Sequence, residues 1–290
     1  MGMPEGVGAI DLMMGIPAGD PQRWYDFLKT QLLDRESRED FEFPAEYMFH
    51  DVPKFEQLDD PVHFLLQQMD HHGIDRAMIG VSFKNEAGIR ALREHSDRFF
   101  GSYEVDPNHG MEGVRELEAA VRELGVKAAT AFPAGLTPQV AINDRKFYPL
   151  YAKCVELDIP ICVCTGVPGP RVPFAPQETA LIDEVCWFFP ELKFVMRHGA
   201  EPWTELAVKL MLKWPNLYYS TSAFAPKYYP EDVVYFANTR GADKIMYAGY
   251  FPMGLSLERI FTDMQNVPFK DEVWPKFLRD NAIRVFKLDE

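Results

Sequence analysis

The sequence predicts a single (β/α)8 TIM barrel that spans residues 1–290. Eight apolar runs of strand length alternate with segments of helical periodicity, and parallel strands covered by helices have this near-continuous hydrophobicity. Eight such units in 290 residues match the usual size of the barrel. A doubly wound sheet would carry a glycine-rich phosphate loop after its first strand, and residues 13–17 (Met-Met-Gly-Ile-Pro) do not form one.

The elements follow one another with local signals at their ends. The first strand stops before Gly15, and the first helix begins with Asp20 as its N-cap and Pro21 at its first helical position. Gly125 closes a long amphipathic helix. The expected strands are 8–14, 76–83, 99–105, 126–132, 160–165, 192–198, 216–222 and 244–249. The expected helices are 20–33, 61–72, 85–94, 110–124, 144–157, 179–188, 203–213, 230–238, 255–262 and 273–283.

One irregular segment, residues 34–60, interrupts this rhythm after the first strand and its helix. It is polar and rich in aromatic residues. A loop of this length inside a compact domain is usually an active-site lid or a binding loop, so we expect one of these roles here.

Charge and cysteine content restrict the partners and the compartment. The net charge is −14 and the pI about 5.0, so the surface repels nucleic acid and anionic lipid. No apolar run is long enough to span a bilayer, and residues 1–11 lack the features of a signal peptide. The four cysteines are clustered without a disulfide spacing, so we expect reduced thiols in a cytoplasmic protein.

Residues 194–203 attract attention because a buried strand there ends on His198. The chain then turns through Gly199 into a helix led by Pro202 and Trp203. In parallel α/β folds the carboxyl ends of the strands hold the chemistry, so His198 is a candidate catalytic residue. A lone histidine at a strand end is also a common structural residue, and both interpretations remain open.

The residue before it, Arg197, lies at the rim of the predicted barrel. Its guanidinium has the geometry to bind a substrate carboxylate or phosphate in bidentate fashion. It would equally suit a structural ion pair with Glu201 or Asp11.

Apolar and acidic side chains share the same edge of the predicted barrel. Strand alternation places Asp11 and Met13 on the side of the barrel axis, and Glu104 ends the third strand. A mouth lined by methionine and aromatic groups favours a large, apolar or flat small-molecule substrate. The expected substrate-binding residues are Arg197, Met13, Glu104, Trp203, Phe251 and Met253.

Several stretches together carry a family resemblance that runs from about residue 9 to residue 288. They are 69–77 (MDHHGIDRA), 95–99 (HSDRF), 147–151 (FYPLY), 190–195 (PELKFV), 214–218 (WPNLY) and 281–282 (NA). On these the chain resembles the amidohydrolase-2 family, metal-dependent barrels that include aminocarboxymuconate-semialdehyde and resorcylate decarboxylases. The resemblance implies a TIM barrel that assembles as a homodimer or a larger homo-oligomer.

The residues at the family's metal positions depart from its pattern. The family begins with Asp-x-His-x-His, and here Asp11 is followed by Met13 and Gly15. Cys164 stands where a histidine precedes Thr-Gly. The strand-six histidine matches His198, and Tyr250 takes the place of the strand-eight aspartate. Because one nitrogen ligand and at best one thiolate remain, we expect no metal at this position and no cofactor.

Three functions remain open for the mouth. His198 could act as a general acid/base, with Asp11 or Glu104 orienting it and Tyr250 donating a hydrogen bond to an oxyanion. Cys164 with His198 could form a nucleophilic thiolate. The pocket could also bind without catalysis, as a pseudoenzyme or accessory protein.

The predicted function is the metal-independent hydrolysis, decarboxylation or hydration of an apolar carbonyl or carboxyl compound by acid/base catalysis. The expected catalytic residues are His198, Tyr250, Cys164 and Asp11. The non-catalytic binding protein on the same barrel is the alternative.

Overall fold

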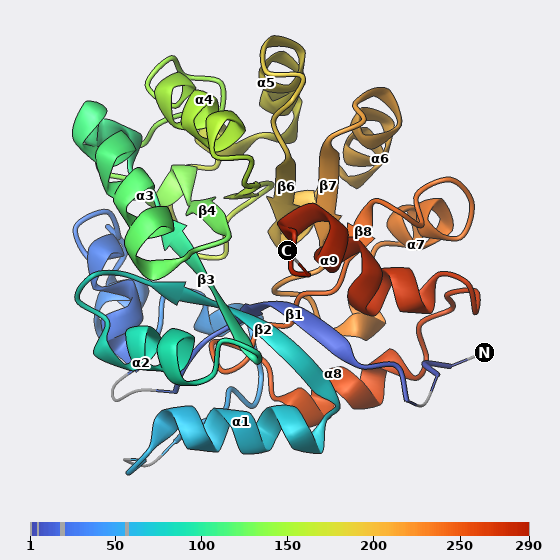
Figure 1. Cartoon of the computed structure of the whole chain (residues 1–290). Helices are drawn as coiled ribbons and strands as arrows, with labels where there is room; N and C mark the ends of the chain where they lie inside the picture. The colour runs from blue at the N-terminus through green and yellow to red at the C-terminus, as the bar shows by residue number, and fades with distance from the viewer. Residues whose placement is uncertain (1, 5, 18–20, 56–57, 290) are drawn as a thin grey trace.

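Eight parallel strands form a ring in this computed structural model, which describes residues 2–4, 6–17, 21–55 and 58–289 (Figure 1). Neighbouring strands pair in chain order from the first to the eighth, and every pair is parallel. The predicted TIM barrel is confirmed. The strands are β1 Ala9–Met14, β2 Ile74–Val81, β3 Phe99–Glu104, β4 Ala128–Ala131, β5 Ile161–Cys164, β6 Phe194–Arg197, β7 Leu217–Ser220 and β8 Ile245–Met246.

Helices cover the outside of the ring (Figure 1). The first predicted helix is a 3-10 helix at Pro21–Leu28, and its expected N-cap Asp20 lies outside the described residues. The last predicted helix starts later and ends later, as a π-helical turn at Lys276–Asp280 that continues into α9. The helices are α1 Pro61–His71, α2 Glu86–Glu94, α3 Met111–Leu124, α4 Tyr148–Glu156, α5 Ile182–Phe188, α6 Thr204–Lys213, α7 Glu231–Ala237, α8 Leu257–Met264 and α9 Asn281–Phe286.

The inside of the ring is filled at the end where the strands begin. Ile10 and Leu12 of β1 pack there with Met78 and Phe100 from β2 and β3. Helix α9 covers the centre of the ring in Figure 1, and its Phe286 closes this inner cluster. The packed end leaves the opposite end, where the strands finish, as the open mouth of the barrel.

The barrel closes weakly between β8 and β1. The two strands form no ladder in the part of the chain that the structure describes. Backbone hydrogen bonds join the Leu12 amide to the Tyr247 carbonyl at 3.3 Å and, just after β1, the Gly15 amide to the Phe251 carbonyl at 2.9 Å. Strand β8 is shorter than expected because the residues after it donate elsewhere. The Tyr247 amide donates to the carbonyl of Phe277, and the Gly249 amide donates to Oδ1 of Asp11 at 2.9 Å. A side-chain carboxylate therefore takes over part of the missing ladder.

The irregular segment after the first helix lies against the mouth. The ring of Phe49 stacks on Tyr250, with centroids 5.4 Å apart. Farther out, the guanidinium of Arg171 lies over the rings of Phe41 and Tyr47 at 5.2 and 5.1 Å. Both contacts join this segment to loops that follow later strands.

No helix among the described residues is long and apolar enough to cross a membrane.

Candidate active site

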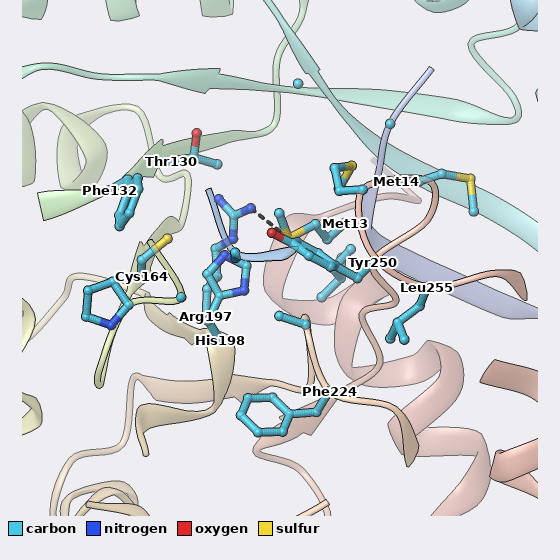
Figure 2. A pocket seen from close by; sticks show the side chains of 18 of the residues that line it. Met13, Met14, Thr130, Phe132, Cys164, Arg197, His198, Phe224, Tyr250 and Leu255 are labelled. Carbon is cyan, nitrogen blue, oxygen red and sulfur yellow. Dashed lines mark hydrogen bonds between the residues drawn. The ribbon is translucent and has the colours of Figure 1, made fainter. Parts of the chain in front are cut away.

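A pocket of 1190 Å³ opens at the carboxyl ends of the strands. Side chains from β1, β3, β5 and β6 reach it, together with residues of the segment at 34–60 and of the loop after β8. In the view of Figure 2, Arg197 and His198 lie at its centre, between Cys164 on one side and Met13 and Tyr250 on the other. The pocket therefore occupies the place where barrels of this kind hold their chemistry.

Most of the residues expected at the site line this pocket, and three do not. Asp11 is fully buried between β1 and the end of β8. Trp203 precedes α6 and packs on the ring of Phe174, with centroids 5.5 Å apart. Phe251 is buried, edge-on to Phe55 at 5.7 Å. The residues that do line it are Met13, Glu104, Cys164, Arg197, His198, Tyr250 and Met253.

Arg197 brings a positive charge to the pocket without an ion pair. Its Nη2 donates to the thioether sulfur of Met13 at 2.8 Å, and its Nε is buried without a hydrogen-bond partner. No carboxylate among the described residues pairs with it, so neither Glu201 nor Asp11 fills the structural role considered above. A half-buried cation with unused donors is a strong site for an anionic group of a ligand.

His198 is held as a neutral imidazole. Burial, and next the charge of Arg197, lower its pKa to about 3. The backbone amide of His198 donates to Oγ of Ser222 at 3.1 Å, and the same Oγ lies 3.2 Å from the ring Nδ1. This hydroxyl has one proton and two lone pairs, so it can accept from the amide and at the same time donate to Nδ1. The ring proton then sits on Nε2, which makes His198 a hydrogen-bond donor at neutral pH.

The backbone at this histidine is unusual. His198, Gly199 and Ala200 have φ values of 62°, 84° and 56°, in the left-handed region that non-glycine residues rarely adopt. The hydroxyl of Tyr219 donates to the carbonyl of Gly199 at 3.1 Å and helps to hold this turn. Strained backbone of this kind is found preferentially at functional sites, where the surrounding structure enforces it.

The two acidic candidates have different environments. Glu104 ends β3 and faces the open pocket with a solvent-accessible side chain, where partial desolvation raises its pKa and the charge of Arg197 lowers it. Burial raises the pKa of Asp11 to about 6, against two backbone amides that donate to its Oδ1, those of Gly249 and Met13, each at 2.9 Å. Asp11 thus holds backbone at the closure of the barrel, whereas Ser222 contacts the histidine ring.

Cys164 is a protonated thiol at neutral pH. Burial raises its pKa to about 11, and the charge of Arg197 opposes this rise only in part. Because the thiolate is the nucleophile, this environment does not favour the nucleophilic role considered above.

The hydroxyl of Tyr250 has a hydrogen-bond partner that could not be identified from the sequence. Its hydroxyl lies 3.3 Å from the hydroxyl of Tyr25, which comes from the 3-10 helix before the irregular segment at 34–60. Burial raises the pKa of both phenols, so both keep their protons at neutral pH. No sequence signal marked Tyr25, because it lies in an ordinary amphipathic segment far from any strand end.

Solved structures with the same fold cover almost the whole chain. An uncharacterised TIM-barrel protein from Bordetella bronchiseptica is 21% identical, with a TM-score of 0.73, over 97% of this chain and 99% of its own. A 5-carboxyvanillate decarboxylase from Novosphingobium aromaticivorans, with bound manganese and 3-methoxy-4-hydroxy-5-nitrobenzoic acid, is 17% identical over 97% of each chain, with a TM-score of 0.69. A 4-oxalomesaconate hydratase from Rhodopseudomonas palustris is 18% identical over 97% of this chain and 96% of its own, with a TM-score of 0.63. No curated protein matches the sequence.

The expectation that the protein has no metal cofactor was wrong. Similar decarboxylase structures contain manganese. In this chain His71, His72 and Glu258 form a group whose ligand atoms all lie within 4.8 Å of one another, so a metal site is plausible. No strand-end pattern marks this group, because His71 ends α1, His72 follows it and Glu258 lies in α8.

The mouth itself offers a different set of donors. His198 supplies one imidazole and Met13 a thioether, while Cys164 and Tyr250 are a protonated thiol and a protonated phenol. The cation Arg197 already donates to the sulfur of Met13. Manganese prefers carboxylate, carbonyl and water ligands, so these five side chains do not fit it, whereas the carboxylate of Glu104 in the same pocket is of the right type.

A family model described as Amidohydrolase matches residues 22–288, which is most of the chain. This match agrees with the eight-stranded barrel, with the mouth pocket and with the folds of the similar structures. The chain belongs to the amidohydrolase 2 family.

Proposed function

We propose that this chain is an enzyme that binds a small aromatic or otherwise apolar carboxylate in the mouth pocket and decarboxylates or hydrates it. The observation that carries the proposal is the unpaired guanidinium of Arg197 among apolar walls. Family membership supports it, as do the decarboxylases and the hydratase among the similar structures.

Substrate recognition follows from charge and shape. The free donors of Arg197 bind the carboxylate of the substrate, because a charge-assisted hydrogen bond in a poorly solvated pocket is strong. Methionine and aromatic side chains, such as Met13, Phe132 and Phe224, contact the flat or apolar body. The segment at 34–60 acts as the lid in this proposal, since its Phe49 stacks on Tyr250.

Proton transfer is assigned to Glu104. In a decarboxylation the electron pair of the breaking C–C bond goes to a carbon that must take up a proton as carbon dioxide leaves. The raised pKa of Glu104 favours its protonated form, and it lines the same pocket as Arg197. Water returns the proton to Glu104 afterwards.

Two uncharged hydrogen-bond donors are available to stabilise negative charge that develops on a substrate oxygen. Nε2 of His198 and the hydroxyl of Tyr250 both belong to the pocket, and their rings lie 5.6 Å apart. Donors that are fixed before the reaction stabilise an oxyanion without reorganisation. In this mechanism Cys164 lines the pocket and does not act as a nucleophile.

The deciding experiment replaces Arg197 by methionine. We expect the Arg197→Met variant to bind 3-methoxy-4-hydroxy-5-nitrobenzoate at least tenfold more weakly in calorimetry, since a hydrogen bond to a charged group contributes about 1.5–3 kcal/mol. The matched control is Arg259→Met, which removes a pocket-lining arginine whose Nη1 donates to the carbonyl of His50. Equal affinity in wild type and Arg197→Met would remove the basis of the proposal.

Turnover separates the enzyme from a binding protein. Wild-type protein is assayed for carbon dioxide release from 5-carboxyvanillate and related benzoates, and for hydration of 4-oxalomesaconate. Glu104→Gln should retain the carboxylate affinity and lose turnover. A wild type that binds these carboxylates tightly and converts none of a broad panel favours the non-catalytic alternative.

Assembly and compartment are also part of the proposal. Exposed aromatic side chains on α5, Trp187 and Phe188, support a homo-oligomer, which light scattering would test. Four free, buried cysteines support a reducing compartment such as the cytoplasm. Fractionation of the native cells would test this placement.

A further inference from the structure

We propose that the outside of the barrel carries a site for a transition-metal dication such as Zn²⁺, formed by His71, His72 and Glu258. The bound ion would clamp α1 to α8 beside the weak closure between β8 and β1. This inference is independent of the proposed function, because it uses none of the pocket residues.

His72 is the fixed member of the site. Its side chain is only 8% exposed, and its Nδ1 lies 2.9 Å from the carbonyl oxygen of Gln68. Because a carbonyl only accepts, Nδ1 carries a proton, and Nε2 is the ring atom left to bind a metal. This Nε2 is buried without a hydrogen-bond partner. Metal-bound histidines have this same arrangement, in which the second ring nitrogen donates to a backbone carbonyl.

The buried Nε2 faces a carboxylate. Oε2 of Glu258 lies 3.7 Å from Nε2 of His72, which is too long for a hydrogen bond. When the ring is neutral these two atoms are acceptors that face each other, and a cation between them satisfies both. The ring of Phe261 lies 5.5 Å from that of His72 and limits its freedom to turn away.

His71 completes the group. Its ring lies 4.8 Å from that of His72, and it is exposed, as is Glu258 at 80%. Bonds to Zn²⁺ are about 2.0–2.2 Å long, so tetrahedral ligand atoms lie about 3.3 Å apart. Two mobile side chains can close the present spacing around the fixed imidazole, and water supplies the fourth ligand.

The position in the fold gives the ion a structural task. His71 ends α1, where the helix dipole favours a cation, and Glu258 lies in the first turn of α8. Helices α1 and α8 lie next to each other in Figure 1, beside the closure where β1 and the chain after β8 form no ladder and are joined by isolated backbone hydrogen bonds. An ion bound by residues of both helices would link the first strand–helix unit of the barrel to the last one.

The test is a Zn²⁺ titration of the whole chain against a competing chelator, together with the melting temperature. We expect one equivalent to bind with micromolar affinity and to raise the melting temperature, and EDTA to reverse the rise. His72→Ala and Glu258→Gln should each weaken binding at least tenfold and abolish the thermal shift. His63→Ala, an exposed histidine of the same helix, is the matched control and should bind normally.

Location is settled by two further measurements. His198→Ala should retain full Zn²⁺ affinity, and the Co²⁺ form should lack the near-ultraviolet charge-transfer band that a thiolate ligand produces. Absence of binding, a thiolate band or normal affinity in Glu258→Gln would overturn the proposal. The glutamate variant alters an exposed side chain, so the test does not depend on how well His72→Ala folds.

Discussion

Asp11→Asn should stabilise the protein at neutral pH, and the gain should grow as the pH rises. Burial raises the pKa of the Asp11 carboxyl from 3.8 to about 6, so the folded chain holds this proton more tightly than the unfolded chain does. Stability from this group is therefore fully present below about pH 4 and is lost as the pH rises through about 6. A rise of this size corresponds to about 3 kcal/mol at neutral pH.

The asparagine retains the contacts that hold the carboxyl in place. Its oxygen can accept from the amides of Met13 and Gly249, as Oδ1 of Asp11 does. Its amide nitrogen would replace Oδ2 beside the hydroxyl of Tyr247, and that hydroxyl can turn to accept from the new amide. The substitution thus removes a buried charge without orphaning either backbone amide.

Urea denaturation from about pH 4 to about pH 8 measures the effect. The free energy of unfolding of Asp11→Asn should equal that of wild type at the acidic end and exceed it by up to about 3 kcal/mol at the basic end. The exposed Asp271, changed to asparagine, is the control and should shift stability by less than about 0.5 kcal/mol at every pH. A destabilised Asp11→Asn at neutral pH, or a gain that does not vary with pH, would refute the reasoning.

Two further substitutions and one labelling reaction test residues at the mouth of the barrel. Gly199→Ala places a Cβ 2.3 Å from the ring of Phe224 at a φ of 84°, so urea denaturation should show a loss of about 2 kcal/mol or more. Cys164 should react with iodoacetamide far more slowly than a free thiol at neutral pH, as peptide mapping would show, because its pKa is about 11. Ser222→Ala should leave the ring of His198 as a mixture of tautomers in nitrogen NMR, since the contact to Nδ1 is lost.

The barrel was predictable because its signal is repeated eight times. Each strand is a short apolar run, and each helix has one apolar face, so an error at one boundary leaves the count unchanged. The length of β8 was not predictable. Its residues are as apolar as those of the other strands, but pairing depends on the neighbour, and the amides after Met246 find partners outside a ladder.

The orientation of Asp11 shows how alternation can fail. Period-two alternation placed Asp11 and Met13 on the same side of β1. Ile10 and Leu12 point into the barrel, so Asp11 faces away from the axis, and the register between β1 and β2 shifts between Asp11 and Met14. The amide of Met13 donates to the side chain of Asp11 across this irregularity, and Met13 lines the pocket. A local bulge is invisible in hydrophobicity, because it changes direction without changing composition.

Side-chain contacts between different strand ends could not be predicted from the sequence, for a different reason. That Arg197 would meet Met13, or that Ser222 would meet His198, depends on which strand ends face each other across the mouth. The positions of the individual residues at strand ends were predictable, and their partners were not. Tyr25 is the extreme case, since it reaches Tyr250 across 225 residues of sequence from a segment that carried no strand signal.

The charge of Arg197 links substrate recognition to the state of the catalytic groups. The charge of Arg197 acts with burial to keep His198 uncharged, and it opposes the effect of desolvation at Glu104. A bound carboxylate would neutralise much of that charge, so binding itself would raise the pKa of Glu104 and favour the protonated acid that decarboxylation needs. The same neutralisation leaves His198 buried and neutral, because burial is the larger cause of its lowered pKa. In the proposed mechanism the substrate therefore helps to set the protonation of its own proton donor, and a neutral ligand of the same shape would not.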